Sequence, residues 1–295
     1  MPNNLLAQFS FFMIIPISGD FSFYIIGFES REVMKVKACI YTDAGKSRKV
    51  NQDSVLVKVA NSEKLGRISF VAVCDGMGGL PKGEVASCKV VRSLENWFHE
   101  ELSLMQDLER DRLWDVIEVS WRRLIARIGG ELRRYARHRK INLGTTLTAL
   151  LQIGDRYMIM NIGDSRIYVA SKGDVIRLTK DHSVLQKKLD EGKITEKEAL
   201  NDREKSVLLR CIGSMKTPEP DIIRGTFEND STVIACSDGF WRTMEKTELY
   251  NMLCPQMCVT SEDMLDSCKK LVKMAYDRNE TDNISVAALC MELGA

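Results

Sequence analysis

The pattern of hydrophobic and polar residues becomes regular from Met34 onward. Short runs rich in Val and Ile, each bounded by turn-forming residues, predict strands. Between residues 83 and 140 turn residues are nearly absent and apolar positions recur at helical spacing, which predicts two long helices. Further strands are expected at 145–153, 156–162, 166–170, 174–178, 222–227, 231–236 and 283–291, after the first three at 35–41, 54–60 and 67–74. Further helices are expected within 183–201 and at 246–253 and 262–276.

The grouping of these elements indicates the fold class. Runs of strands separated by runs of helices favour a layered α+β fold over alternating βαβ units. Gly154-Asp155 and Lys172-Gly173 are typical hairpin turns, so the strands around them are expected to be antiparallel. With 44% hydrophobic residues and no repeat or low-complexity linker, residues 34–295 are expected to form one domain with a large core.

The first 33 residues differ from the rest. Their apolar segments, 9–17 and 21–28, are separated by Ser18, Gly19 and Asp20, and neither reaches the ~20 residues that span a bilayer. A secretory signal would need a Lys or Arg ahead of the first apolar segment, and this sequence has none there. We expect a poorly ordered extension at 1–33, from a start codon placed too early, with Met34 as the true start. A weak membrane tether is the alternative.

Charge and cysteine content narrow the choice of partners and location. The net charge of +1 favours neither nucleic acid nor an anionic membrane. Nine cysteines without a Cys-x-x-Cys motif predict reduced thiols and a cytoplasmic protein. Residues 122–140 are strongly basic, but an acidic stretch at 95–118 precedes them. We therefore expect two packed helices that set acid against base, with a docking surface for nucleic acid or an acidic partner as the alternative.

Aspartates next to glycines follow three of the apolar runs. They are Asp75-Gly76, Gly163-Asp164 and Asp238-Gly239. Each pair alone is an ordinary turn, but three at strand ends indicate carboxylates that converge, with Asp53 and Asp282 as further members. Carboxylates gathered in a partly buried site need a cation, and oxygen-only ligands favour Mg²⁺ or Mn²⁺ over zinc. Two such ions could lower the pKa of a water and direct it at phosphorus.

These aspartates belong to an ordered set of motifs that resembles the type 2C, metal-dependent serine/threonine protein phosphatase family, and its bacterial branch in particular. The match runs from about Met34 to the C-terminus. The motifs are Asp43-x-Gly45-x-x-Arg48-x-x-Asn51-Gln52-Asp53, Asp75-Gly76-Met77-Gly78-Gly79, Gly144-Thr145-Thr146, Gly163-Asp164-Ser165-Arg166, Leu178-Thr179-Lys180-Asp181-His182-Ser183, Ser237-Asp238-Gly239 and Asp282-Asn283-Ile284-Ser285.

The resemblance implies an α+β, four-layer α-β-β-α sandwich, with two central antiparallel sheets flanked by helix pairs and a metal cleft at one end. It implies two core Mn²⁺ or Mg²⁺ ions and a weaker third. Asp75 would bridge the core ions, and Asp164 would share the third ion with Asp238. The other implied ligands, direct or through water, are Asp53, Asp238, Asp282 and the Gly76 carbonyl. Arg48 would bind the substrate phosphate, which its guanidinium fork also suits chemically, and a flap would lie within about 180–213.

Three residues bear on proton transfer and charge. Met77 stands where many eukaryotic members carry a histidine proton donor, and a thioether transfers no proton, although bacterial relatives commonly share this Met. Gln52 replaces a glutamate of some members and removes a charge from the metal surroundings. His182 is a candidate proton relay, but a structural hydrogen-bonding role is the preferred interpretation.

The sequence therefore predicts a monomeric cytoplasmic enzyme that hydrolyses phosphoserine and phosphothreonine in proteins phosphorylated by a serine/threonine kinase. Neither nucleic acid nor firm membrane association is expected. A phosphoprotein-binding pseudophosphatase is the alternative, and the complete aspartate set argues against it. A two-metal nuclease is disfavoured by the near-neutral charge and by the lack of an aromatic and basic groove.

Overall fold

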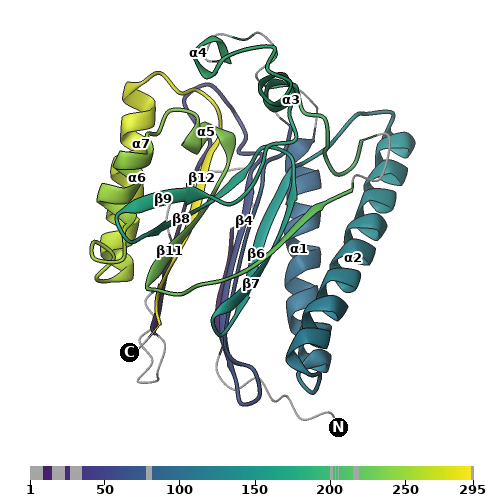
Figure 1. Cartoon of the computed structure of the whole chain (residues 1–295). Coiled ribbons are helices and arrows are strands. Elements are labelled where there is room, and N and C mark those ends of the chain that lie inside the picture. The colour runs from purple at the N-terminus through teal and green to yellow at the C-terminus, as the bar shows by residue number, and fades with distance from the viewer. Residues whose placement is uncertain are drawn as a thin grey trace.

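Two antiparallel sheets lie face to face at the centre of the computed structural model, and helices cover the outer face of each sheet (Figure 1). The structure describes residues 9–14, 24–26, 35–77, 82–199, 202, 204, 206–214 and 219–293. This arrangement confirms the predicted four-layer α-β-β-α sandwich. The helices are α1 (Gly83–Glu100), the 3₁₀ turn η1 (Leu102–Met105), α2 (Arg110–Arg139), α3 (Val184–Asp190), α4 (Glu196–Ala199), α5 (Asp238–Trp241), α6 (Lys246–Leu253) and α7 (Ser261–Asp277).

Within the described residues each sheet contains six strands, and every strand pairing there is antiparallel. The first sheet has the order β1 (Phe9–Ile14), β4 (Ser54–Ser62), β5 (Gly66–Cys74), β6 (Leu147–Ile153), β7 (Arg156–Ile162) and β10 (Asp221–Thr226). The second has the order β2 (Tyr24–Ile26), β3 (Lys35–Asp43), β12 (Ile284–Glu292), β11 (Ser231–Cys236), β8 (Arg166–Ser171) and β9 (Asp174–Arg177).

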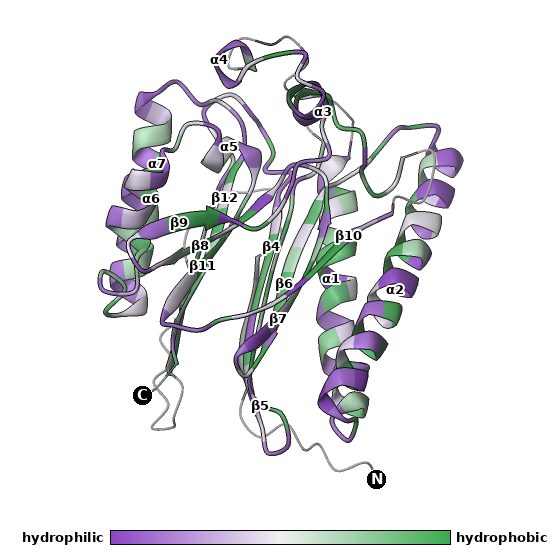
Figure 2. Cartoon of the chain, in the orientation of Figure 1, coloured by the Kyte–Doolittle hydropathy of each residue, from purple (hydrophilic) through white to green (hydrophobic). Residues whose placement is uncertain are grey.

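Most strands are nearly continuous runs of apolar residues because both of their faces are buried (Figure 2). In β5, Val71 and Val73 face the core between the sheets, whereas Phe70 lies in the core beneath α1 and α2. Phe70 stacks on Phe98 with ring centroids 5.8 Å apart, and Trp121 packs on its ring at the same distance. These aromatic contacts fix the helical layer against the first sheet.

Two short edge strands come from the extension that precedes Met34. β1 pairs with β4, and β2 pairs with β3. Each lies inside one of the two apolar segments for which the sequence patterns predicted no strand, and the remainder of 1–33 lies outside the described residues. Within the described part of the chain, no helix has the length and apolar character needed to cross a bilayer.

The strand registers bring six chain segments to one end of the sandwich. Ser54 at the start of β4 pairs with Cys74 at the end of β5, and Ile284 at the start of β12 pairs with Asp43 at the end of β3. Because neighbouring strands are antiparallel, the ends of β7 and β11 reach the same edge. All the aspartate motifs adjoin these strand termini.

Candidate active site

Five aspartates lie at this end of the sandwich, each next to a strand terminus. Asp53 and Asp282 precede β4 and β12, Asp75 follows β5, Asp164 follows β7, and Asp238 follows β11 and opens α5. The structure brings them near enough that the charges of Asp53, Asp238, Asp164 and Asp282 each raise the pKa of Asp75. The sequence analysis predicted this convergence of carboxylates.

The carboxylate of Asp53 is buried without compensation. Its side chain is 1% exposed, and neither oxygen accepts a hydrogen bond with good geometry from a described residue. Burial, together with the charges of Asp238 and Asp282, raises the pKa of Asp53 to about 7, although the nearby hydroxyls of Ser285 and Ser237 act in the opposite direction. A buried carboxylate of this kind is stabilised either by binding a proton or by binding a cation.

The backbone around Asp75 is held on both sides. Its amide donates to Thr146 Oγ1 (2.9 Å), and its carbonyl accepts from Thr146 N (2.8 Å) and Thr145 Oγ1 (2.9 Å). Burial, and then the charge of Asp53, raise the pKa of Asp75 well above its usual range. At Gly76 a Cβ would lie 2.5 Å from the Gln52 carbonyl oxygen, so only glycine permits this close approach of the two loops.

An arginine that the sequence analysis did not identify lies among these carboxylates. Arg242 Nη2 donates to Asp238 Oδ2, and Arg242 Nη1 lies 3.8 Å from Glu280 Oε2. Burial raises the pKa of Asp238, and the Arg242 charge opposes this shift, while Asp238 Oδ1 is buried and has no partner among the described residues. Burial also raises the pKa of Asp164 well above its usual range.

Arg48 lies at the rim of the cluster and is bound to one of the predicted metal ligands. Its Nε is 3.0 Å from Asp282 Oδ1 and its Nη2 is 3.3 Å from Asp282 Oδ2, with the two side chains 39% and 29% exposed. Gly45 has a φ of +78°, and a Cβ there would lie 2.2 Å from the Asp282 carbonyl oxygen. The loop that carries Arg48 therefore packs directly on the Asp282 loop.

His182 links two loops and is buried. Its Nδ1 accepts a hydrogen bond from Gly163 N (3.2 Å), and its Nε2 lies 3.0 Å from Asp221 Oδ2 and 3.2 Å from Arg210 Nη1. These contacts support the structural role over the proton relay. Met77 is held by its amide, which donates to the Gly144 carbonyl (3.0 Å).

The donor set suits a hard divalent cation. It contains only oxygens, and the buried Asp53 oxygens and Asp238 Oδ1 have no described partner. In the described ranges no group of three or more acidic, histidine or cysteine side chains is arranged so that it could hold a metal ion by itself in this conformation. The Gly76 carbonyl and water would then complete the coordination, which is the usual situation for Mg²⁺ in proteins.

Comparisons with known proteins agree with the motifs and the fold. A family model described as protein phosphatase 2C matches residues 43–281. The serine/threonine phosphatase stp of Listeria monocytogenes is 33% identical over 247 residues, which are 83% of this chain and 92% of that protein. The S. agalactiae serine/threonine phosphatase structure superposes with a TM-score of 0.73 at 26% identity, covering 86% of this chain and 99% of that one.

A second solved structure bears on the metal site. The catalytic domain of the serine/threonine protein phosphatase PstP, in complex with two manganese ions, superposes with a TM-score of 0.69 at 25% identity and covers 88% of this chain and 99% of that one. The motif order, the fold and the matched family model together show that this chain belongs to the protein phosphatase 2C family.

Proposed function

We propose that this chain is a metal-dependent phosphatase that hydrolyses phosphoserine and phosphothreonine monoesters in proteins. The observation that carries the proposal is the set of buried carboxylates at Asp53, Asp164 and Asp238, which surround the half-buried Asp75 on rigid strand ends and have too few cationic partners. A cluster of this kind is costly to fold unless it binds cations. Because the chain belongs to the protein phosphatase 2C family, we assign phosphate ester hydrolysis to this cluster.

The metal ligands follow from the same cluster. We propose Asp75 as the residue shared by two Mn²⁺ or Mg²⁺ ions, since the charges of all four other aspartates act on it. The remaining ligands are Asp53, Asp238, Asp282 and the Gly76 carbonyl, and Asp164 with Asp238 would hold a weaker third ion. The PstP structure contains two manganese ions, which supports the proposal of two ions in the core site. When bound, such ions neutralise phosphate charge and make water a nucleophile near neutral pH.

Arg48 is the proposed phosphate-binding residue. Its guanidinium is partly exposed and already makes a two-pronged contact with the Asp282 carboxylate, which has the same arrangement of oxygens as one edge of a phosphate. A substrate phosphate at the rim would compete with Asp282 for the guanidinium group of Arg48. Arg48 would then orient the monoester and stabilise the negative charge that develops on its oxygens.

The leaving serine or threonine oxygen needs a proton. Met77 carries none to transfer, and the ring nitrogens of His182 are engaged with Gly163, Asp221 and Arg210. We therefore assign this proton to water at the site rather than to either side chain.

The segment 180–213 is the proposed flap. It carries α3 and α4, which lie beyond the strand ends at the same end of the molecule as α5 (Figure 1). The Leu209 amide donates to the His182 carbonyl (2.8 Å), and Thr145 pairs with Ile212, so both ends of the segment are fixed beside the aspartates. The part between them can therefore contact a bound phosphoprotein.

A phosphoprotein-binding protein without turnover is the less favoured function. Recognition of a phosphate needs arginine or backbone donors, and it does not need buried carboxylates whose ionisation is unfavourable. The proposed substrates are proteins phosphorylated by a serine/threonine kinase, and the proposed location is the cytoplasm. We further propose that the enzyme acts as a monomer.

Phosphate release from a phosphothreonine peptide tests the proposal. The purified chain with Mn²⁺ should release phosphate, EDTA should stop the release, and Asp75→Asn should abolish it with an unchanged circular dichroism spectrum. Asp277→Asn is the matched control because Asp277 is exposed at the end of α7. Background rates for the wild-type chain, or full activity in Asp75→Asn, would contradict the proposal.

A further inference from the structure

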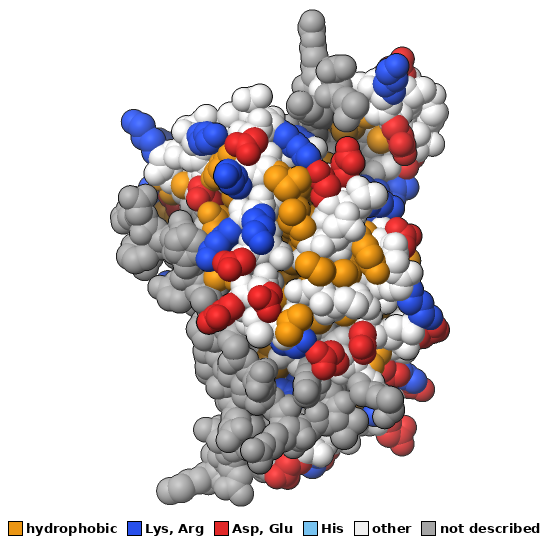
Figure 3. Space-filling view, turned by 90° about the vertical axis from the view of Figure 1, so that its left-hand side faces the viewer, with side chains coloured by type: hydrophobic (Ala, Val, Ile, Leu, Met, Phe, Trp, Pro, Cys, Tyr) orange, Lys and Arg blue, Asp and Glu red, His pale blue; other side chains and the backbone are white. Residues whose placement is uncertain are grey.

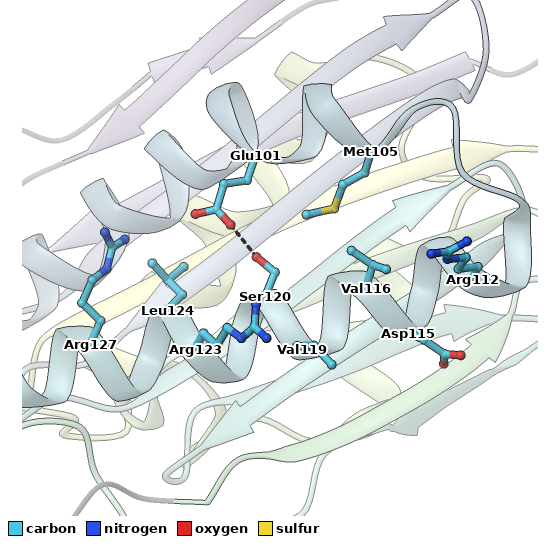
Figure 4. A pocket seen from close by; sticks show the side chains of 10 residues that line it. All are labelled: Glu101, Met105, Arg112, Asp115, Val116, Val119, Ser120, Arg123, Leu124 and Arg127. Carbon is cyan, nitrogen blue, oxygen red and sulfur yellow. Dashed lines mark hydrogen bonds between the residues drawn. The ribbon is translucent and has the colours of Figure 1, made fainter.

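A cavity of about 660 Å³ lies between η1 and α2, away from the five aspartates (Figure 4). Its apolar lining comes from Met105 and from Val116, Val119 and Leu124 of α2, and its charged rim includes three arginines of α2. They are Arg112, Arg123 and Arg127. Spacings of three and four residues put most of these α2 positions on one face of the helix. We refer to this site as the α2 groove, and its volume is in the range of ligand-binding pockets.

The two acidic side chains of the α2 groove are already engaged. Glu101 Oε2 accepts a hydrogen bond from Ser120 Oγ (2.6 Å), as Figure 4 shows, and Asp115 Oδ1 lies 2.8 Å from Arg224 Nη1. The three rim arginines, in contrast, make no ion pair or hydrogen bond through their side chains to a described residue. Glu131 is the acidic neighbour whose pKa is lowered by a hydrogen bond with Lys89 and also by the Arg127 charge. No ion pair or hydrogen bond to a described residue engages the three guanidinium groups around the apolar floor of the α2 groove.

This finding corrects the expected pairing of an acidic with a basic helix. The ion pair that joins α1 to α2 within the described residues is Lys89 with Glu131, which has the opposite polarity to the one expected. Arg122 pairs with Glu118 of its own helix, and Arg224 of β10 pairs with Asp115 and Glu118. Arg224 thus neutralises Asp115 and Glu118 of α2, whereas the rim arginines Arg112, Arg123 and Arg127 make no ion pair with a described residue.

Apolar side chains are exposed at the α2 groove. Val119 is 46% exposed, and Leu104 in the neighbouring η1 turn is 84% exposed. On the face formed by the second sheet's helices, by comparison, Lys and Arg are interspersed with Asp and Glu (Figure 3). Exposed apolar residues surrounded by free guanidinium groups match a ligand that is both apolar and anionic.

We propose that the α2 groove binds an acidic, amphipathic segment of a partner protein. Its Asp and Glu side chains would pair with Arg112, Arg123 and Arg127, and one large aliphatic or aromatic side chain would pack on the Val116 and Leu124 floor. Arg112 and Arg127 are separated by about 22 Å along the helix axis, which an extended segment of about seven residues spans. Bidentate pairing with arginine gives such a contact its specificity.

The lining of the α2 groove disfavours nucleic acid as the occupant. Among the described residues no aromatic side chain lines it for base stacking, and Glu101 and Asp115 lie among the arginines, where they would repel a phosphate backbone. The catalytic end lies some 18 residues away along α1, from Gly83 to Glu101, or about 27 Å. A segment in the α2 groove would leave the aspartates accessible.

Fluorescence anisotropy with an unphosphorylated probe tests this inference without requiring turnover. The probe is a labelled peptide of about twelve residues built from Glu-Glu-Leu repeats, long enough to cover the α2 groove. The double substitution Arg123→Glu and Arg127→Glu should weaken binding about tenfold or more. Arg134→Glu with Arg137→Glu is the matched control, since both residues are exposed on α2 outside the lining and should change binding less than about twofold.

The outcomes separate the alternatives. A Glu-Glu-Ser peptide should bind more weakly than the probe, because it lacks the apolar anchor, and p-nitrophenyl phosphate hydrolysis should be unchanged in both double variants. Failure of the probe to bind, or equal weakening by the two double substitutions, would overturn the proposal. Tighter, competitive binding of a single-stranded oligonucleotide at the same arginines would overturn it in favour of nucleic acid.

Discussion

Asp53→Asn should make the metal-free protein more stable. The wild-type carboxylate is 1% exposed, and its pKa rises from 3.8 to about 7 on burial. A rise of about three pKa units corresponds to about 4 kcal/mol of unfavourable free energy once the group is ionised. The carboxylates of the cluster share this cost, so we expect a gain of about 2–4 kcal/mol, or roughly 5–10 °C in Tm for a domain of this size.

The pH dependence has a defined sign. The folded state holds the Asp53 proton more tightly than the unfolded chain, so the free energy of unfolding falls as pH rises from about 4 to about 7. The advantage of Asp53→Asn should be absent near pH 4, grow through this window and be complete above about pH 7.5. With excess Mn²⁺ the difference should shrink or reverse, because a bound cation stabilises only the wild-type site.

Thermal unfolding in EDTA, followed by circular dichroism at several pH values, measures this effect. Asp277→Asn provides the control for an exposed aspartate and should change Tm by less than about 2 °C. If Asp53→Asn melts below wild type at pH 8 in EDTA, or if its advantage does not depend on pH, the argument that burial opposes ionisation of Asp53 is wrong.

Three further substitutions test other parts of the site. Arg48→Ala should lower kcat/KM for a phosphopeptide about a hundredfold with little change in Tm, and Arg48→Lys should restore only part of it, as initial rates would show. Arg242→Met should lower the free energy of unfolding in EDTA by about 3 kcal/mol in urea titrations, because Asp238 loses its buried cation, and Mn²⁺ should narrow the gap. Gly45→Ala should reduce both Tm and Mn²⁺ affinity, because its Cβ would collide with backbone. Gly66→Ala is the control, because Gly66 has a similar positive φ but open space around it, so its cost should be about 1 kcal/mol.

Much of the fold could be predicted because the sequence pattern is locally consistent. The strands β4, β5 and β7 lie within a residue or two of their predicted ranges, and the two long helices occupy the segment without turn residues. The edge strands β1 and β2 could not be predicted in this way. Their apolar segments are short and interrupted. β1 finds its hydrogen-bond partners on β4, which is distant in sequence, and β2 has only three residues, which pair with the next strand, β3.

In the candidate site, too, some residues could be predicted from local sequence and others could not. The aspartates are visible in the sequence because each adjoins a strand and a glycine, or stands in an ordered motif. The pairing of Arg48 with Asp282 spans 234 positions, so no local spacing indicates it. Arg242 is four residues after Asp238, but that spacing has meaning only once Asp238 is known to begin a helix.

Calorimetric titration of Mn²⁺ into the EDTA-treated, dialysed protein tests most directly whether the converging carboxylates form a cation site. We expect two ions bound per chain in the core site, loss of this binding in Asp75→Asn, and unchanged binding in Asp277→Asn. Absence of Mn²⁺ binding by the folded wild-type chain, or an Asp75→Asn titration that overlays it, would contradict the account.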